Sequence, residues 1–229
     1  MSLKDGKDYL YLIWKDSISR QQFIIGKLIK NGQFEFKYCG EINEAIKSGF
    51  IPLVSLPDLD KVYVSARLFP VFSSRLPDRK RKDIHRILKK YGLEEYDEYL
   101  LLKNSGARLP IDTLEFIDPI LSLAQSFRRT FFITGPGYYI NCNGKVCENS
   151  FDINRGDEVV LKCEPDNPSD ENAVQVLDIF GTLLGYVPRY YSAGIAELLH
   201  QNRDIKCHIC SVNKSKNCNE CIQVILNVN

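Results

Sequence analysis

The stretch that most constrains the fold runs from Asp157 to Arg189, where two strand-like runs flank a highly specified polar turn. The turn has the sequence EPDNPSDEN and holds far more proline, aspartate and asparagine than a simple β-hairpin needs. Proline fixes the backbone φ angle, and Asp and Asn side chains bond nearby backbone N–H groups. The sequence therefore predicts a loop of defined shape on an antiparallel sheet, of a kind that often carries function.

Short strand-like runs continue on both sides of this turn. Strands are expected at 131–134 continuing to 138–140 after a Gly-Pro-Gly kink, and at 158–164, 173–179, 183–187, 205–212 and 222–228, with one helix at 191–201. Many short strands with a single helix are typical of a small OB-like or SH3-like β-barrel.

The first half has a different pattern. Strands at 9–14, 22–30 and 34–38 form a predicted β-meander, with Asn31-Gly32 as a type I′ turn. Further elements are expected as short helices at 41–47 and 97–103, a strand at 111–117, and a longer basic helix capped by Asp78 and ended by Gly92. The predicted fold class is thus α+β and β-rich, a meander with helices followed by a small barrel.

A change of charge divides the chain. Residues 1–129 carry 22 basic and 17 acidic side chains, whereas residues 130–229 carry 8 and 12. The stretch 121–129 lies at this change and is compatible with a helical linker. We therefore expect domains at 1–120 and 130–229, joined by a linker at 121–129.

Composition also predicts a location. No apolar run of 18 residues is present, and Asp5, Asp8 and Asp16 near the start argue against a signal peptide. We therefore expect a cytoplasmic chain without a membrane partner. In that setting its eight cysteines are expected to be thiols or metal ligands rather than a disulfide framework.

Four cysteines form two CxxC pairs near the end of the chain, at Cys207, Cys210, Cys218 and Cys221. Zinc is one interpretation of this spacing. Folding the hairpin about Lys214 sets Cys210 opposite Cys218 and Cys207 opposite Cys221, but residues three apart in a strand point to opposite faces. Cross-strand thiols or disulfides, and burial as small apolar side chains, are the alternatives. No other cofactor is expected.

Three segments of the second half, GPGYY at 135–139, INRGDEVVLKCEPDNPSDENAVQV at 153–176 and GTLLGYVPRYYSAGIAELL at 181–199, occur in the order found in a known module. Through them this half resembles the HIRAN domain of fork-remodelling helicase-like proteins. The resemblance implies an OB-like barrel that holds single-stranded DNA, in the best-known members at a 3′ end.

The first half contains IIGKL at 24–28, FEFKY at 34–38, LFPVFSSRLPDRKR at 68–81 and YLLL at 99–102. Through these segments it resembles the N-terminal, non-kinase subdomain of HipA-type toxin kinases. Kinase, Walker A, GxSxG and HExxH motifs do not occur in the sequence. We therefore expect no enzyme activity.

The HIRAN resemblance implies a strand-end site on the EPDNPSDEN loop. Asn167 and Asp170 match the family positions that meet the terminal nucleotide. The Asp170 carboxylate suits a free hydroxyl there, because it would repel a phosphate. Tyr138 matches a stacking aromatic, and Tyr186 and Arg189 match positions that approach the phosphate.

Two positions depart from the family pattern: Gly137 stands where eukaryotic members carry an arginine, and Ser169 replaces an aromatic. Each good base stack contributes about 1–3 kcal/mol, so one lost stack weakens binding about tenfold or more. The alternatives for this loop are a purely structural role, in which its Asx side chains bond their own backbone, and a peptide-binding role.

The predicted basic helix is a second candidate nucleic-acid site. Eight basic residues lie between Arg75 and Lys90 against Asp78 and Asp83, and Arg79, Arg81 and Lys82 are the candidate phosphate contacts. A solvated charged helix face is the alternative.

Together these features predict a non-catalytic nucleic-acid-binding protein of bacterial type. Single-stranded or damaged DNA is the expected ligand, and an adaptor role in repair or in toxin-related regulation is the expected context. The alternative is a protein–protein interaction module in which the HipA-like half recruits a partner and the barrel is a scaffold.

Overall fold

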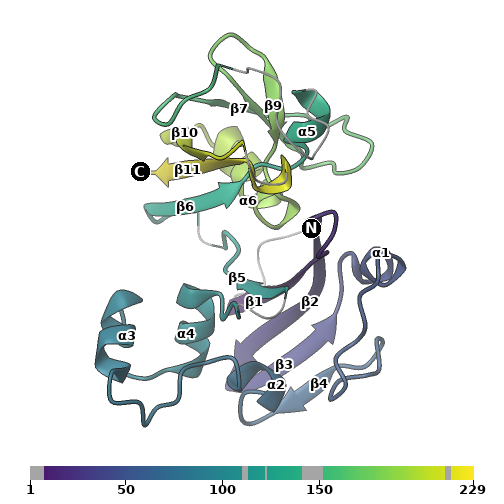
Figure 1. The fold of residues 1–229 in the computed structure, drawn as a ribbon, viewed down its shortest axis with the longest axis vertical. Helices are drawn as coiled ribbons and strands as arrows, with labels where there is room; N and C mark the ends of the chain where they lie inside the picture. Colours follow the sequence, from purple (N-terminus) through teal and green to yellow (C-terminus); the bar gives the residue numbers. More distant parts are fainter. Residues whose placement is uncertain (1–7, 110–112, 122, 141–151, 215–217) are drawn as a thin grey trace. The chain divides into compact units, whose positions relative to one another are not determined.

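The structure is a computed structural model that describes residues 8–109, 113–121, 123–140, 152–214 and 218–229. The chain divides into two compact units, Met1–Pro119 and Ile120–Asn229 (Figure 1). Both units are built mainly of antiparallel strands with short helices. The predicted α+β, β-rich fold class is confirmed.

Unit 1 is organised on one five-stranded sheet in the order β4-β3-β2-β1-β5. Its strands are β1 (Asp8–Lys15), β2 (Gln22–Asn31), β3 (Gln33–Tyr38), β4 (Tyr63–Ser65) and β5 (Leu114–Ile117). The predicted meander is therefore present. The type I′ turn is wrong, because Gly32 alone has a positive φ of 72° and Asn31 still pairs with Gln33.

Four helices accompany this sheet: α1 (Ile42–Lys47), α2 (Pro70–Ser73), α3 (Ile84–Lys90) and α4 (Glu98–Ser105). Helix α4 begins where the Asp97 carboxylate accepts the Leu100 N–H and ends at Gly106, whose φ is 68°. The helices close one core with the sheet, in which the largest fully buried side chains include Tyr99, Phe36, Phe72 and Phe116.

The long basic helix expected from Asp78 to Gly92 is wrong in its first part. The Asp78 carboxylate accepts the Lys80 N–H at 2.7 Å, which closes a turn, and helix α3 starts only after its N-cap residue, Asp83. Asx side chains compete with helix formation in this way. Arg79, Arg81 and Lys82 therefore lie in turns that precede α3.

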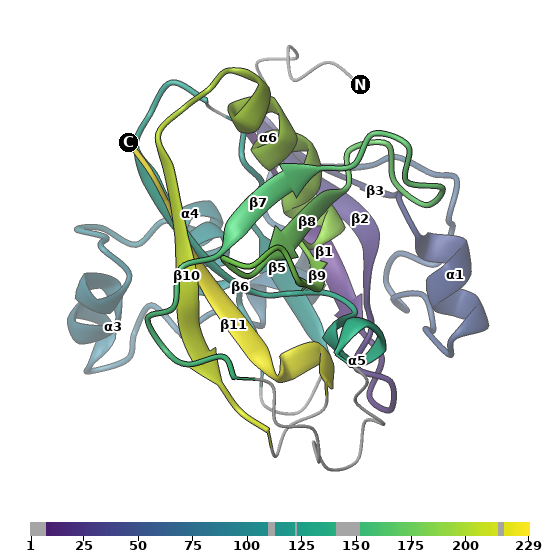
Figure 2. The same ribbon diagram turned by 90° about the horizontal axis from the view of Figure 1, so that it is seen from above.

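Unit 2 contains two open three-stranded sheets within its described residues, in the orders β10-β11-β6 and β7-β8-β9 (Figure 2). The strands are β6 (Phe127–Phe132), β7 (Val160–Cys163), β8 (Val174–Leu177), β9 (Leu183–Tyr186), β10 (Ile205–Val212) and β11 (Ile222–Val228). Isolated bridges join Thr134 to Tyr186 and Glu158 to His208, so each sheet is tied to the other.

Helix α6 (Arg189–His200) packs its apolar stripe, including Ile195 and Leu198, into the core of unit 2. This helix and the residue ranges of β10 and β11 agree with the prediction. The strand expected at 138–140 is wrong, because Pro136–Tyr139 form the short helix α5. Gly135, with a φ of 75°, turns the chain, and the fixed φ of Pro136 suits a first helical position.

The helix expected within the 121–129 linker is also wrong, since no described residue of that stretch is helical and β6 begins at Phe127. Ile120, just before this stretch, packs on α6. A Cβ atom at Gly194 would lie 2.7 Å from the Ile120 Cβ, so only glycine permits this approach. The Arg203 guanidinium also donates to the Leu123 carbonyl.

Candidate nucleic-acid interface

The loop between β7 and β8 is shaped by its own side chains. The Asn167 Oδ1 atom accepts the N–H groups of Ser169 at 3.0 Å and Asp170 at 3.2 Å. The Asp170 Oδ1 atom accepts the Asn172 N–H at 3.0 Å. These bonds replace ladder hydrogen bonds where the backbone leaves the sheet, and they give the loop a defined shape.

Four further hydrogen bonds fix this loop, and three of them connect it to β9 and α6. The Glu164 Oε2 atom accepts the Asn167 side-chain amide at 2.7 Å and the Tyr186 hydroxyl at 2.8 Å. The Ser192 hydroxyl donates to the Asp170 Oδ2 atom at 2.8 Å, and the Arg189 guanidinium donates to the Ser169 carbonyl. The loop is thus fixed at both ends and at its tip.

Glu164 joins the loop to β9, a role that the sequence analysis missed. The hydrogen bond from Asn167, followed by that from Tyr186, lowers the pKa of its carboxyl. Partial burial, followed by the bond to Glu164, raises the pKa of Tyr186 to about 12. The sequence indicates this role only by placing Glu164 at the start of the turn. Its partner Tyr186 lies 22 residues further along the chain, so the sequence does not show the contact.

Glu164→Gln is expected to flatten the acid side of the stability profile of unit 2. The folded-state pKa of Glu164 lies below its unfolded value, so its contribution is present above the unfolded pKa and is lost as pH falls through the folded one. Amide hydrogen exchange of β8 and β9 between neutral pH and about pH 3 measures this. Glu171→Gln, at an exposed residue of the same loop, should keep the wild-type profile.

A row of tyrosines leads from helix α5 to the loop. Tyr138 is 83 % exposed, and its ring meets the edge of the Tyr139 ring at a centroid distance of 5.1 Å. The Tyr139 ring lies 5.4 Å from the Tyr186 ring, whose hydroxyl bonds Glu164. An exposed aromatic backed by two further rings offers a preformed surface for a nucleobase.

The structure brings all five predicted residues of this half into one connected region. Tyr138 connects through Tyr139 to Tyr186, then through Glu164 to the loop that holds Asn167 and Asp170, and Arg189 bonds the same loop. Both carboxylate oxygens of Asp170 already accept hydrogen bonds, from Asn172 and Ser192. The structural role weighed for these Asx residues is therefore present, whatever else they bind.

The predicted basic residues of unit 1 differ among themselves. Arg75 is buried and donates through Nε to the Ala107 carbonyl at 3.0 Å, so it does not belong to a phosphate-binding surface. Arg79 is exposed and lies 4.7 Å from the Tyr96 ring centroid, and Lys82 is exposed.

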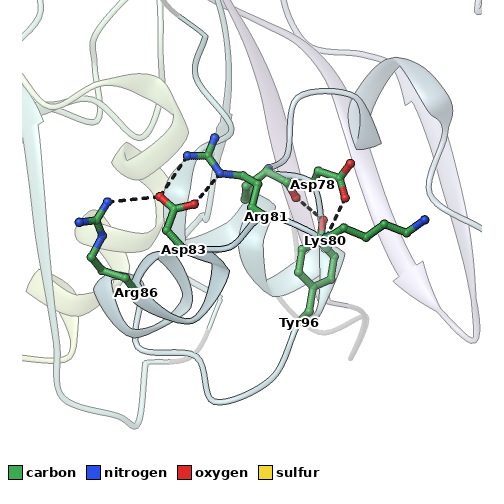
Figure 3. A network of polar contacts seen from close by, with 7 residues as sticks. Asp78, Lys80, Arg81, Asp83, Arg86 and Tyr96 are labelled. Carbon is green, nitrogen blue, oxygen red and sulfur yellow. Dashed lines mark hydrogen bonds and ion pairs between the residues drawn. The ribbon is translucent and has the colours of Figure 1, made fainter.

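Arg81 and Arg86 share one carboxylate. Arg81 bonds Asp83 through Nε at 2.8 Å and Nη2 at 3.1 Å, and Arg86 approaches the same group at 3.2 Å (Figure 3). The Arg81 bond, above the other contacts, lowers the pKa of Asp83 to about 2. Asp83 therefore stays ionised at neutral pH and holds both guanidinium groups.

The expected register of the cysteine hairpin is wrong. Cys207 lies opposite Leu226, Cys210 lies at a bulge of β10, and the short helix η1 (Cys218–Glu220) delays the start of β11 to Ile222. Burial raises the pKa of the Cys207 thiol to about 12.

No three Cys, His, Asp or Glu side chains of the described residues lie close enough together to hold a metal ion. Cys142 and Cys147 are outside the described residues. Zinc binding stays a prediction, which metal analysis of the purified chain tests.

Among the helices of the described residues, none has the length and apolarity that a membrane crossing requires.

The fold and the site define a two-domain, β-rich chain whose second unit presents a fixed polar loop beside a row of tyrosines. Residues 17–110 match the HipA N-terminal domain and residues 129–228 match the HIRAN domain. The chain therefore carries a HipA N-terminal domain followed by a HIRAN domain, as the sequence predicted.

Two solved structures are similar to part of the chain. The HIRAN domain of human HLTF is 21 % identical, with 45 % of this chain and 72 % of that chain covered and a TM-score of 0.32. A protein from Lactobacillus plantarum is 18 % identical, with 45 % and 97 % covered and a TM-score of 0.34. No curated protein matches the chain at a significant level.

Proposed function

We propose that this chain binds nucleic acid through its HIRAN domain and that its ligand is the 3′ end of single-stranded DNA. The observation that carries the proposal is the connected surface from Tyr138 through Tyr186 to the Asn167 loop, within a domain of this family. It combines an aromatic platform for a base with polar groups for a sugar, the two features that strand binding needs.

The proposed role is non-catalytic. In the cytoplasm the chain would act as an adaptor in repair or in toxin-related regulation, with the HipA N-terminal domain free to contact a protein partner. The absence of kinase and hydrolase motifs from the sequence supports binding without turnover.

Fluorescence anisotropy with two oligonucleotides that differ only in a 3′-hydroxyl or a 3′-phosphate tests the ligand. We expect tighter binding of the 3′-hydroxyl strand, because the Asp170 carboxylate lies in the loop and repels a phosphate. Equal affinity for both strands would contradict the strand-end assignment.

Tyr138→Ala is expected to weaken single-strand binding about tenfold, because one base stack contributes about 1–3 kcal/mol. The fold should be unaffected, since Tyr138 is 83 % exposed. Phe180→Ala is the matched control: Phe180 is 88 % exposed in the same unit but lies on the β8–β9 turn. An equal loss in both variants would show that Tyr138 is not a specific stacking partner.

The β8–β9 turn itself favours a second candidate function, protein binding. Ile179 and Phe180 are exposed there, and the Asp178 Oδ1 atom fixes the turn by accepting the N–H groups of Phe180 at 2.9 Å and Thr182 at 2.8 Å. A fixed turn that exposes two apolar side chains is a common protein contact. If neither oligonucleotide binds, this alternative takes precedence.

A further inference from the structure

The turns before α3 and the helix itself form an exposed basic surface on the HipA N-terminal domain. We define the basic surface by six of the seven exposed basic residues of this stretch: Lys80, Arg81, Lys82, Arg86, Lys89 and Lys90. The seventh, Arg79, lies over the Tyr96 ring. Of the two acids in the same stretch, the Asp78 carboxylate accepts the Lys80 backbone N–H. Asp83 binds two arginines and cancels only one of their charges. The surface therefore keeps a net positive charge.

Its cations are held in two different ways. Arg81 uses Nε and Nη2 for Asp83, so its Nη1 atom stays available, and the shared carboxylate fixes the orientation of both guanidinium groups (Figure 3). The ammonium groups of Lys82 and Lys89 contact no carboxylate in the described part of the chain. Oriented guanidinium groups beside exposed lysine ammonium groups suit a partner with several phosphates.

The support beneath this surface is rigid. The Tyr96 hydroxyl donates to the Pro77 carbonyl at 2.8 Å, and Arg79 lies against the Tyr96 ring. Ile84 and Leu88 of α3 are buried in the core. The turns are thus anchored by Tyr96 and helix α3 by the core, and the basic side chains project from this anchored backbone.

The chemistry of the surface favours nucleic acid over a membrane surface or a protein interface with an apolar centre. None of the large exposed apolar side chains of the described residues lies between 78 and 92. Membrane-surface helices need an exposed apolar face, and protein interfaces usually have an apolar centre. A phosphate backbone needs neither.

We propose that this basic surface is a second nucleic-acid contact, which binds the phosphate backbone of a strand without regard to base sequence. The proposal extends the proposed function to the other domain and rests on it for the choice of nucleic acid over an acidic peptide.

The test compares the full chain with Lys80→Glu/Lys82→Glu/Lys89→Glu. Anisotropy of a 3′-hydroxyl single strand is measured from about 50 to 200 mM salt. We expect the triple variant to bind about tenfold or more weakly at low salt. The slope of log K against log salt should fall by about 2, at about 0.7 for each lost phosphate contact.

The matched control is Lys37→Glu/Lys47→Glu/Lys61→Glu, which makes the same change of net charge at exposed lysines elsewhere on unit 1. It should keep nearly the wild-type slope. If the two triple variants lose the same affinity for the strand, or if neither variant changes the salt slope, the proposal is overturned.

The preference for a 3′-hydroxyl over a 3′-phosphate separates the two sites. The basic-surface variant should keep the preference for the 3′-hydroxyl strand. If a protein loses this preference while its salt slope stays at the wild-type value, the result counts against the HIRAN site and not against the basic surface. If the wild-type chain binds no oligonucleotide but binds polyglutamate, the surface is assigned to an acidic protein and the nucleic-acid proposal fails.

Discussion

Replacing Arg75 with methionine is expected to destabilise unit 1 by about 3 kcal/mol. Arg75 donates through Nε to the Ala107 carbonyl at 3.0 Å and through Nη2 to the Leu114 carbonyl at 2.9 Å. These carbonyls lie just past the end of α4 and at the start of β5, so one side chain joins two elements. Methionine keeps the apolar stem but leaves both acceptors without this donor, at about 1–3 kcal/mol for each buried group.

The measurement follows the single tryptophan during denaturant unfolding, because Trp14 packs against Phe23 and Phe50 in unit 1. Arg67→Met is the control, an exposed arginine eight residues earlier in the chain, and should change stability by no more than about 0.5 kcal/mol. Equal effects of the two substitutions would show that the buried bonds of Arg75 contribute nothing specific.

Gly185→Ala is expected to have a comparably large effect on unit 2, about 3 kcal/mol. Gly185 has a φ of 153°, and a Cβ atom there would lie 2.6 Å from the Thr134 carbonyl oxygen. That carbonyl accepts the Tyr186 N–H at 2.9 Å, in the bridge that joins the two sheets. Backbone strain and overpacking each cost about 1–3 kcal/mol.

Faster hydrogen exchange at the Thr134 and Tyr186 amides, with unchanged Trp14 fluorescence, is the expected observation. Gly181→Ala separates strain from overpacking, since Gly181 has a φ of 88° but no atom within 4 Å of its added Cβ. Gly181→Ala should lower the free energy of unfolding by backbone strain alone, about 1–2 kcal/mol. If Gly185→Ala costs no more than Gly181→Ala, the close approach to Thr134 is not the cause. We expect Gly185→Ala to displace Tyr186, so the binding of single-stranded DNA should weaken as well.

The sequence predicted most strands because their signal is local. Alternation in FEFKY defines both the strand and its buried face, and the apolar run at 222–228 indicates a strand; β3 and β11 form there. A helix was expected at 97–103, and α4 forms at Glu98–Ser105 between the capping residues Asp97 and Gly106. The sequence predicted the EPDNPSDEN loop because that stretch is unusually rich in proline, aspartate and asparagine.

The errors came from competition between local signals and from contacts between distant residues. Asp78 could cap a helix or close a turn, and the bond to the Lys80 N–H favours the turn. The cysteine hairpin was paired by assuming a tight turn, whereas η1 lengthens the connection and shifts the register. Glu164 was missed because its bond to Tyr186 depends on the pairing of three strands.

The packing of Ile120 on Gly194 decides where the HIRAN domain can be separated from the rest of the chain. The family match begins at Arg129, yet a fragment cut there would lose Ile120, the Leu123 carbonyl that binds Arg203, and the first residues of β6. The surface of α6 around Gly194, which Ile120 covers, would then be exposed to water. A HIRAN fragment for binding studies should therefore start no later than Ile120, nine residues before the family match begins.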